Sequence, residues 1–215
     1  MARLWDISPP VAASTPVYPG DQPFELRWTA TPEPDGVVRV GSLTTTTHIG
    51  AHADAPLHYD PQGATIGALP LEPYIGHCRV VHAYDGGPRL GWEQLAHALP
   101  ASGPIPPRLL VRTYRRQPGR WDPGLSGLAP ELLERLAERG VLLVGTDSAS
   151  VDPADSAALE SHQVLRRRGL RVLEGLCLDA VPEGDYELIA LPLKLMDADA
   201  SPVRAVLRPW PVPDR

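Results

Sequence analysis

Three histidines and one aspartate occur within a segment of eleven residues, HIGAHADAPLH, which begins at His48, ends at His58 and contains His52 and Asp54. Neutral imidazole nitrogens and carboxylate oxygens are the ligands that zinc and related divalent metals take from proteins. Folding alone seldom requires four such side chains so close together. The segment therefore predicts a metal site, in preference to a polar loop whose histidines only form hydrogen bonds.

The residues that flank this segment favour a loop over a helix. The run Thr44–Thr47 is β-branched and prefers a strand, and Pro56 disfavours helical backbone at Ala55. An extended chain would spread the four side chains over roughly 30 Å, at about 3.3 Å per residue, which is too far for one ion. We therefore expect a strand over 37–47 and then a compact loop, in which Gly50 and the alanines let the backbone curl around an ion.

Two more polar residues stand in apolar surroundings later in the chain. His162 lies three residues from a leucine on each side in a predicted helix over 157–168, and Glu174 lies in an apolar strand predicted over 170–178. Individually they would be a core histidine and a solvent-facing carboxylate. The tight turn between helix and strand can bring them together, and a buried carboxylate needs a partner such as a cation. We expect both to join the metal site, whose mixed ligands suit either one catalytic ion with an open position or a pair of ions bridged by Asp54 and Glu174.

The composition is that of an ordinary globular protein. The chain has 215 residues, 43% of them hydrophobic and 21% charged, which predicts a single domain over 1–215. The net charge of −6 disfavours nucleic acid or an anionic membrane as a partner, and no apolar run has membrane-spanning length. The opening MARLWDIS lacks a secretory pattern, so we expect a cytoplasmic protein in which Cys78 and Cys177 stay reduced.

Short strands separated by many turns are expected, because the chain contains 26 prolines and 19 glycines. Strands outnumber helices and alternate with them in the second half, which predicts an α/β domain with a mixed sheet or open barrel. We expect residues 62–73 to be irregular, as a flexible cover over the site, and a turn at 33–36. The predicted strands are 3–7, 24–29, 37–47, 77–84, 108–114, 141–145, 170–178, 187–195 and 203–207, and the predicted helices are 91–99, 130–140 and 157–168, the last capped by Asp155 and Ser156.

The motifs of the chain, taken in order, resemble those of the cyclase-like metal hydrolases, the family of the bacterial kynurenine formamidases (arylformamidases). The resemblance covers essentially the whole chain, and such a series in one order is highly specific. It implies a compact α/β fold with a swivelling-type β core, and commonly a homodimer. The motifs are WDISP, YPGD at 18–21, the H-x-G-x-H-x-D-x-P-x-H segment, GTDSASVD at 145–152, ESHQVL and GLRVLEGLCLD, LPLKL and DASPVRAVLRP.

The resemblance also implies an activity, which is the metal-dependent hydrolysis of N-formyl-L-kynurenine to L-kynurenine and formate in tryptophan degradation. By this resemblance two zinc ions, with manganese as an alternative, would be held by His48, His52, Asp54, His162 and Glu174, while His58 would be the acid/base and Tyr18 a substrate contact. Tyr18 replaces a tryptophan found in many relatives, and Ile49 replaces a threonine. Any aromatic ring can stack on the substrate's aryl ring, so we expect altered affinity and an intact ligand set.

In the expected mechanism the metal lowers the pKa of a bound water, and His58 passes a proton from water to the departing aniline nitrogen. Other possibilities stay open: another aryl amide, a lactam such as isatin, a cyclising reaction, or a metal-binding protein without turnover. A serine hydrolase built on Ser148 is disfavoured because its surroundings lack the G-x-S-x-G pattern.

Overall fold

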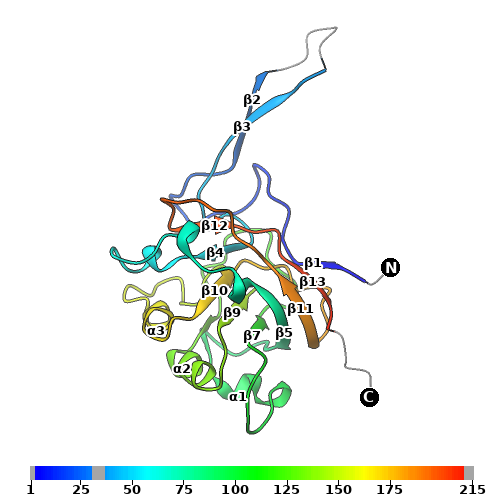
Figure 1. The fold of residues 1–215 in the computed structure, drawn as a ribbon, viewed down its shortest axis with the longest axis vertical. Helices are drawn as coiled ribbons and strands as arrows, with labels where there is room; N and C mark the ends of the chain where they lie inside the picture. The colour runs from blue at the N-terminus through cyan, green and yellow to red at the C-terminus, as the bar shows by residue number, and fades with distance from the viewer. Residues whose placement is uncertain (1–2, 31–36, 211–215) are drawn as a thin grey trace.

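A mixed nine-stranded sheet organises the protein (Figure 1), for which a computed structural model describes residues 3–30 and 37–210. The pairs β5–β7, β7–β9 and β9–β10 are parallel, and the other neighbours are antiparallel. The predicted α/β class is therefore confirmed. From one edge to the other the strands are β1 (Trp5–Asp6), β13 (Val206–Pro209), β11 (Gly184–Ile189), β5 (Ile75–His82), β7 (Arg108–Arg112), β9 (Leu143–Thr146), β10 (Arg171–Glu174), β4 (His52–Asp54) and β12 (Ala200–Pro202).

Helices connect the parallel strands and lie on one side of them (Figure 1). The short helix α1 (Trp92–Leu95), extended by the 3-10 turn η4 (Ala96–Ala98), links β5 to β7, while α2 (Pro130–Glu138) links β7 to β9 and α3 (Glu160–Arg168) links β9 to β10. Parallel neighbours require such crossovers because the chain must return to the same end of the sheet. A proline at its first position suits α2, since the ring fixes a helical φ where no amide donor is needed.

Two hydrophobic cores lie on opposite faces of the sheet, because successive strand side chains alternate between faces. Leu109 and Val172 pack with the helices, while Leu110 and Leu173, one residue further along, pack on the other face. The helix-side core includes Val81, Leu132, Leu133, Leu136, Val144 and Leu165, and the opposite core includes Ile7, Tyr74, Leu143, Leu188 and Leu207.

Some predicted elements differ from the observed ones at their ends. Helix α3 begins at Glu160, because Leu159 has a left-handed φ of 49° and its N–H donates to the Ser156 hydroxyl over 3.2 Å. The predicted cap at Asp155 and Ser156 is therefore wrong. The strand predicted over 203–207 is also wrong as a single element, since β12 ends at Pro202 and β13 begins at Val206.

Two small sheets lie outside the main one. Strands β2 (Glu25–Ala30) and β3 (Val40–Thr44) form an antiparallel hairpin that projects from the body of the molecule (Figure 1), and every residue of both strands is exposed. The turn predicted at 33–36 lies outside the described residues. Strands β6 (Arg89–Leu90) and β8 (Gly127–Leu128) form a two-residue parallel pair beside the helices.

The flexible cover predicted over 62–73 is wrong. This segment forms the 3-10 turns η2 (Ile66–Ala68) and η3 (Glu72–Tyr74), and none of its residues lines the cavity of the candidate site. The side chains of Ile66 and Tyr74 are buried in the core, and the Ile66 N–H donates to the Ala198 carbonyl over 2.9 Å. These two buried side chains hold the segment against the core. The pattern of turn residues in the sequence did not reveal this packing.

Two expectations from composition concern thiols and membranes. Cys78 and Cys177 are both free thiols in the structure, as predicted. None of the helices in the described ranges combines the length and apolar character that a bilayer crossing requires.

Candidate metal centre and its cavity

The sheet pairing of β4 assembles the centre of the site. His52 and Asp54 are two residues apart on this strand, so their side chains share one face. Glu174 stands directly opposite His52 in the antiparallel β4–β10 pair. One ligand atom from each of these three residues lies within 4.8 Å of the others. The sequence predicts a loop here. The structure corrects this prediction, because the short strand β4 lies between a turn and η1 (Pro56–His58).

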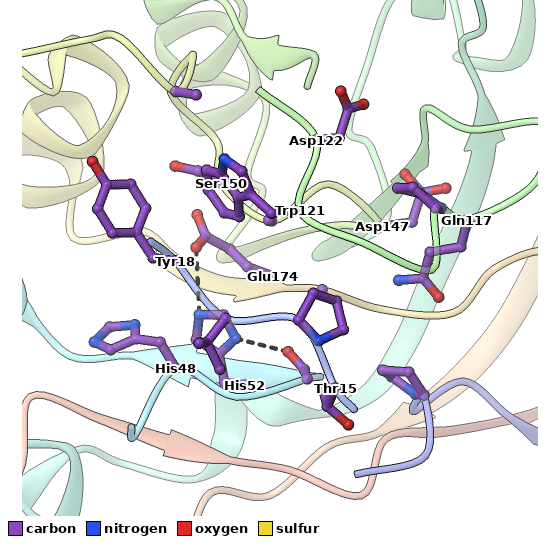
Figure 2. A pocket seen from close by; sticks show the side chains of 18 of the residues that line it. Thr15, Tyr18, His48, His52, Gln117, Trp121, Asp122, Asp147, Ser150 and Glu174 are labelled. Carbon is purple, nitrogen blue, oxygen red and sulfur yellow. Dashed lines mark hydrogen bonds and ion pairs between the residues drawn. The ribbon is translucent and has the colours of Figure 1, made fainter. Parts of the chain in front are cut away.

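The carboxylate of Asp54 lies between two groups of imidazoles, one formed by His48 and His52 and the other by His162 alone. Its Oδ1 is 3.1 Å from Nδ1 of His48 and 3.5 Å from Nε2 of His52, while its Oδ2 is 3.6 Å from Nε2 of His162. Glu174 also contacts both groups, with Oε2 at 3.5 Å from His52 Nε2 and Oε1 at 3.6 Å from His162 Nε2. The five residues predicted as ligands are therefore brought together; Figure 2 shows His48, His52 and Glu174 meeting at one part of the cavity.

Several atoms of this cluster are buried without a hydrogen-bond partner in the structure: Nε2 of His52, Nε2 of His162 and both carboxylate oxygens of Asp54. Such atoms are costly to bury unless a hydrogen-bond partner or a cation binds them. Bound cations would satisfy these atoms, and imidazole with carboxylate is a donor set that zinc and its neighbours accept. The residues therefore fit a divalent metal.

Backbone and carboxylate acceptors orient two of the imidazoles. Nδ1 of His52 lies 2.9 Å from the carbonyl oxygen of Gly50, and Nδ1 of His162 lies 2.7 Å from Oδ2 of Asp152. Each contact assigns the ring proton to Nδ1 and leaves the Nε2 lone pair for a metal. The first contact depends on Gly175, whose φ is +63° and where an added Cβ would be 2.3 Å from the Gly50 oxygen.

Sequence reasoning missed Asp152. This buried carboxylate accepts hydrogen bonds from the N–H groups of Ser161 and His162, at 2.9 and 3.1 Å, in addition to the His162 ring contact. It therefore caps α3 and holds the His162 side chain in place at the same time. The only signal was its position in the GTDSASVD motif, because it lies eight residues before the helix and outside any local capping pattern.

Asp199 was also missed, and it connects His48 with His58. Its Oδ2 lies 2.9 Å from His48 Nε2 and 3.3 Å from His58 Nδ1, and its Oδ1 accepts from the Thr47 hydroxyl over 2.9 Å. The pairing of β12 with β4 places it there. His58 lies at the margin of the cluster with its side chain one-third exposed, and one of its ring nitrogens lies within 4.8 Å of atoms of His48 and Asp54.

The charge balance of the cluster favours bound positive charge. Burial opposes protonation of His48 and His162, but the neighbouring carboxylates outweigh it and raise their pKa values to about 9 and about 10. Burial likewise opposes ionisation of Asp54, but its histidine neighbours hold its pKa well below the ordinary value. Protons and metal ions therefore compete for the same nitrogens, so metal affinity should fall as the pH falls.

A cavity of about 640 Å³ opens beside the cluster. Tyr18, the predicted substrate contact, lines it together with Trp121, and the two rings meet edge to face with centroids 5.1 Å apart. Ser148 is buried and does not line the cavity, which gives no support to a serine nucleophile there. The cavity is of the size that small-molecule sites usually have.

The mixed sheet and the buried imidazole–carboxylate cluster define an α/β protein with a candidate metal centre. The Cyclase family model matches residues 5–153, and the chain belongs to this family. A kynurenine formamidase of Paracidovorax citrulli (strain AAC00-1) is 64% identical over 207 residues, covering 95% of this chain and 96% of that relative. A kynurenine formamidase of Delftia acidovorans (strain DSM 14801 / SPH-1) is 59% identical over 206 residues, covering 96% and 97%.

A solved structure has the same fold. It belongs to a protein described as a potential metal-dependent hydrolase with cyclase activity, with a TM-score of 0.83, 26% sequence identity, and coverage of 99% of this chain and 100% of the other.

The contact between Asp152 and His162 predicts a metal-affinity effect. Asp152→Asn should weaken zinc binding about 10- to 100-fold, because the amide is a poorer acceptor for the ring N–H that orients His162. Competition with a chromogenic chelator at fixed pH measures this, and circular dichroism checks the fold. Asp155→Asn, an exposed carboxylate on the same loop, is the matched control and should leave affinity unchanged. Equal affinities for both variants would contradict the role given to Asp152.

Proposed function

We propose that this protein hydrolyses N-formyl-L-kynurenine to L-kynurenine and formate, as an arylformamidase of tryptophan degradation. The observation that carries the proposal is the identity of 64% and 59% with two relatives named kynurenine formamidase, over nearly the full length of each chain. An isatin-type lactam as the substrate is not favoured, because both of these relatives carry the formamidase name. A metal-binding protein without turnover is not favoured either, because the cluster adjoins a cavity large enough for a substrate.

The proposed cofactor is zinc, with two ions held by His48, His52, Asp54, His162 and Glu174. The unpartnered buried atoms and the mixed nitrogen and oxygen donor set support this assignment. When bound, such an ion supplies Lewis-acid polarisation of the formyl oxygen and a lowered pKa of water. The shared position of Asp54 between the two groups of imidazoles supports two ions over one.

The proton transfers are assigned to His58. Contact of its Nδ1 with Asp199 leaves Nε2 as the nitrogen that exchanges protons with the reactants. His58 takes a proton from the attacking water as the new carbon–oxygen bond forms, and it donates that proton to the aniline nitrogen as the carbon–nitrogen bond breaks. Formate and the free aniline of L-kynurenine are the products. The rings of Tyr18 and Trp121 offer an aromatic wall to the substrate's aryl ring.

The proposed activity is tested with purified protein and N-formyl-L-kynurenine. We expect formate and L-kynurenine in equal amounts, loss of turnover after treatment with a chelator, and recovery on addition of zinc. L-Kynurenine absorbance and a formate assay measure the two products. A metal-loaded sample that hydrolyses isatin and leaves N-formyl-L-kynurenine intact would overturn the proposal.

Replacing His58 separates proton transfer from metal binding. His58→Ala should lower kcat about 10²- to 10⁴-fold while the metal content stays that of the wild type, because the five ligands are unchanged. Elemental analysis of the purified variant gives the metal content. His97→Ala is the control, since this exposed histidine pairs with Glu183 and does not line the cavity. If His58→Ala loses metal in proportion to activity, His58 is a ligand.

We also propose a cytoplasmic homodimer whose interface includes the β2–β3 hairpin. Leu26 and Leu43 stand opposite each other in the pairing, and Trp28 lies on the same face of the hairpin; all three are half or more exposed. This exposed apolar face supports the proposal of an interface with a second copy of the chain.

Sedimentation equilibrium tests the dimer. We expect a mass of two chains for the wild type and a shift toward one chain for the double variant Leu26→Asp, Leu43→Asp, because two carboxylates cannot be buried unpaired at the interface. Leu142→Asp changes an exposed leucine outside the hairpin and should stay dimeric. A wild type that sediments as a single chain at micromolar concentration would contradict this proposal.

A further inference from the structure

One side chain gives the cavity wall a permanent positive charge. Among the described residues that line the cavity, Arg120 is the only arginine or lysine, and it shares the wall with the carboxylates of Asp21, Asp122, Asp147, Glu174 and Asp179. Away from the metal cluster, the other charged side chains of the described lining are carboxylates, which repel an anionic group. Charge therefore favours Arg120 as the place on this wall for a ligand's carboxylate.

The guanidinium of Arg120 is available for a ligand. It is exposed, and no hydrogen bond or ion pair joins it to another residue within 3–30 or 37–210. Arg115 on the same segment is different, because it pairs with Asp85 over 2.8 Å. Arg116 is exposed and likewise without such a partner, but it does not line the cavity. Arg120 therefore differs from Arg116 in its position on the cavity wall and not in its exposure.

The segment that carries Arg120 is held on both sides. Before it, Gln117 donates from its backbone N–H to Asp179 over 3.0 Å and from its side-chain amide to the Leu176 carbonyl over 2.9 Å. After it, Asp122 accepts from the Tyr114 hydroxyl over 3.0 Å. Figure 2 shows Gln117, Trp121 and Asp122 around the cavity that also contains His52 and Glu174. These contacts fix the backbone from which the Arg120 side chain extends.

The proposed substrate carries the matching group. N-Formyl-L-kynurenine has a formamide on its aryl ring and, at the far end of a neighbouring side chain, an α-carboxylate and an α-ammonium. With the formamide at the metal cluster and the aryl ring beside Trp121 and Tyr18, the amino-acid end extends along the remaining wall. We propose that the guanidinium of Arg120 binds the α-carboxylate of the substrate and makes this residue a determinant of specificity. This inference rests on the proposed function.

Arginine suits this role because its planar guanidinium can donate two parallel hydrogen bonds to a carboxylate. The contact is distant from the bond that breaks, so it is equally strong in the ground state and the transition state. Its loss should therefore raise KM and leave kcat almost constant. The aspartates of the same wall can attract the α-ammonium. The wall would then favour amino-acid substrates over simple aryl formamides.

The test compares two substrates across three variants. N-Formyl-L-kynurenine carries the amino-acid group, and N-(2-acetylphenyl)formamide has the same formamide and ketone without it. The readout is the ratio of kcat/KM for the two. We expect Arg120→Ala to lower this ratio about tenfold or more through KM for N-formyl-L-kynurenine, Arg120→Lys to restore part of it, and Arg116→Ala to leave it at the wild-type value.

Product binding gives a second readout that needs no turnover. L-Kynurenine should bind the Arg120→Ala protein about tenfold more weakly than the wild type, while 2-aminoacetophenone should bind both with similar affinity, as measured by calorimetry. An unchanged ratio, or an equal fall for both substrates, would overturn the role of Arg120. Failure of the proposed function has a different signature, namely a metal-loaded wild type that hydrolyses neither formamide.

Discussion

The buried carboxylate of Asp54 is the constraint on which the site depends. Its two oxygens have no hydrogen-bond donor, and they face histidines from both sides. A carboxylate in that position is stable only beside positive charge, whether protons on the imidazoles or a metal ion. The sheet order brings the neighbouring groups to it, since β4 lies between β10, which carries Glu174, and β12, which Asp199 directly precedes. The fold thus holds together an arrangement of charges that would be unstable without a cation.

The local features of the site could be predicted from the sequence. The spacing of His48, His52 and Asp54 indicated a metal site because such residues rarely gather for other reasons, and the hairpin that joins α3 to β10 correctly placed His162 near Glu174. In both cases the residues lie close together along the chain, so short-range rules were sufficient. The mixed sheet followed from the alternation of strands and helices. The strand at β4 did not, because glycine and alanine spacers fit a loop equally well.

The residues that support these predicted ligands could not themselves be predicted. Asp199 reaches His48 through the pairing of β12 with β4, and about 150 residues of chain separate the two partners. Asp152 acts on His162 from a loop that carries no helical or strand pattern. Sequence reasoning recognises a ligand by its chemistry, whereas an aspartate that orients a ligand looks like any other aspartate. Arg120 is similar, because only the shape of the cavity separates it from Arg116.

The close approach of Gly175 to Gly50 has a consequence for how this protein tolerates change. The acceptor that aims the His52 ring belongs to the main chain, so no substitution at position 50 can delete it. A bulkier residue at position 175 would displace that carbonyl without touching the imidazole itself. Position 175 is therefore sensitive to substitution as well as position 50, whose φ is +61°. A substitution at position 175 could therefore abolish function although Gly175 is not among the predicted metal ligands.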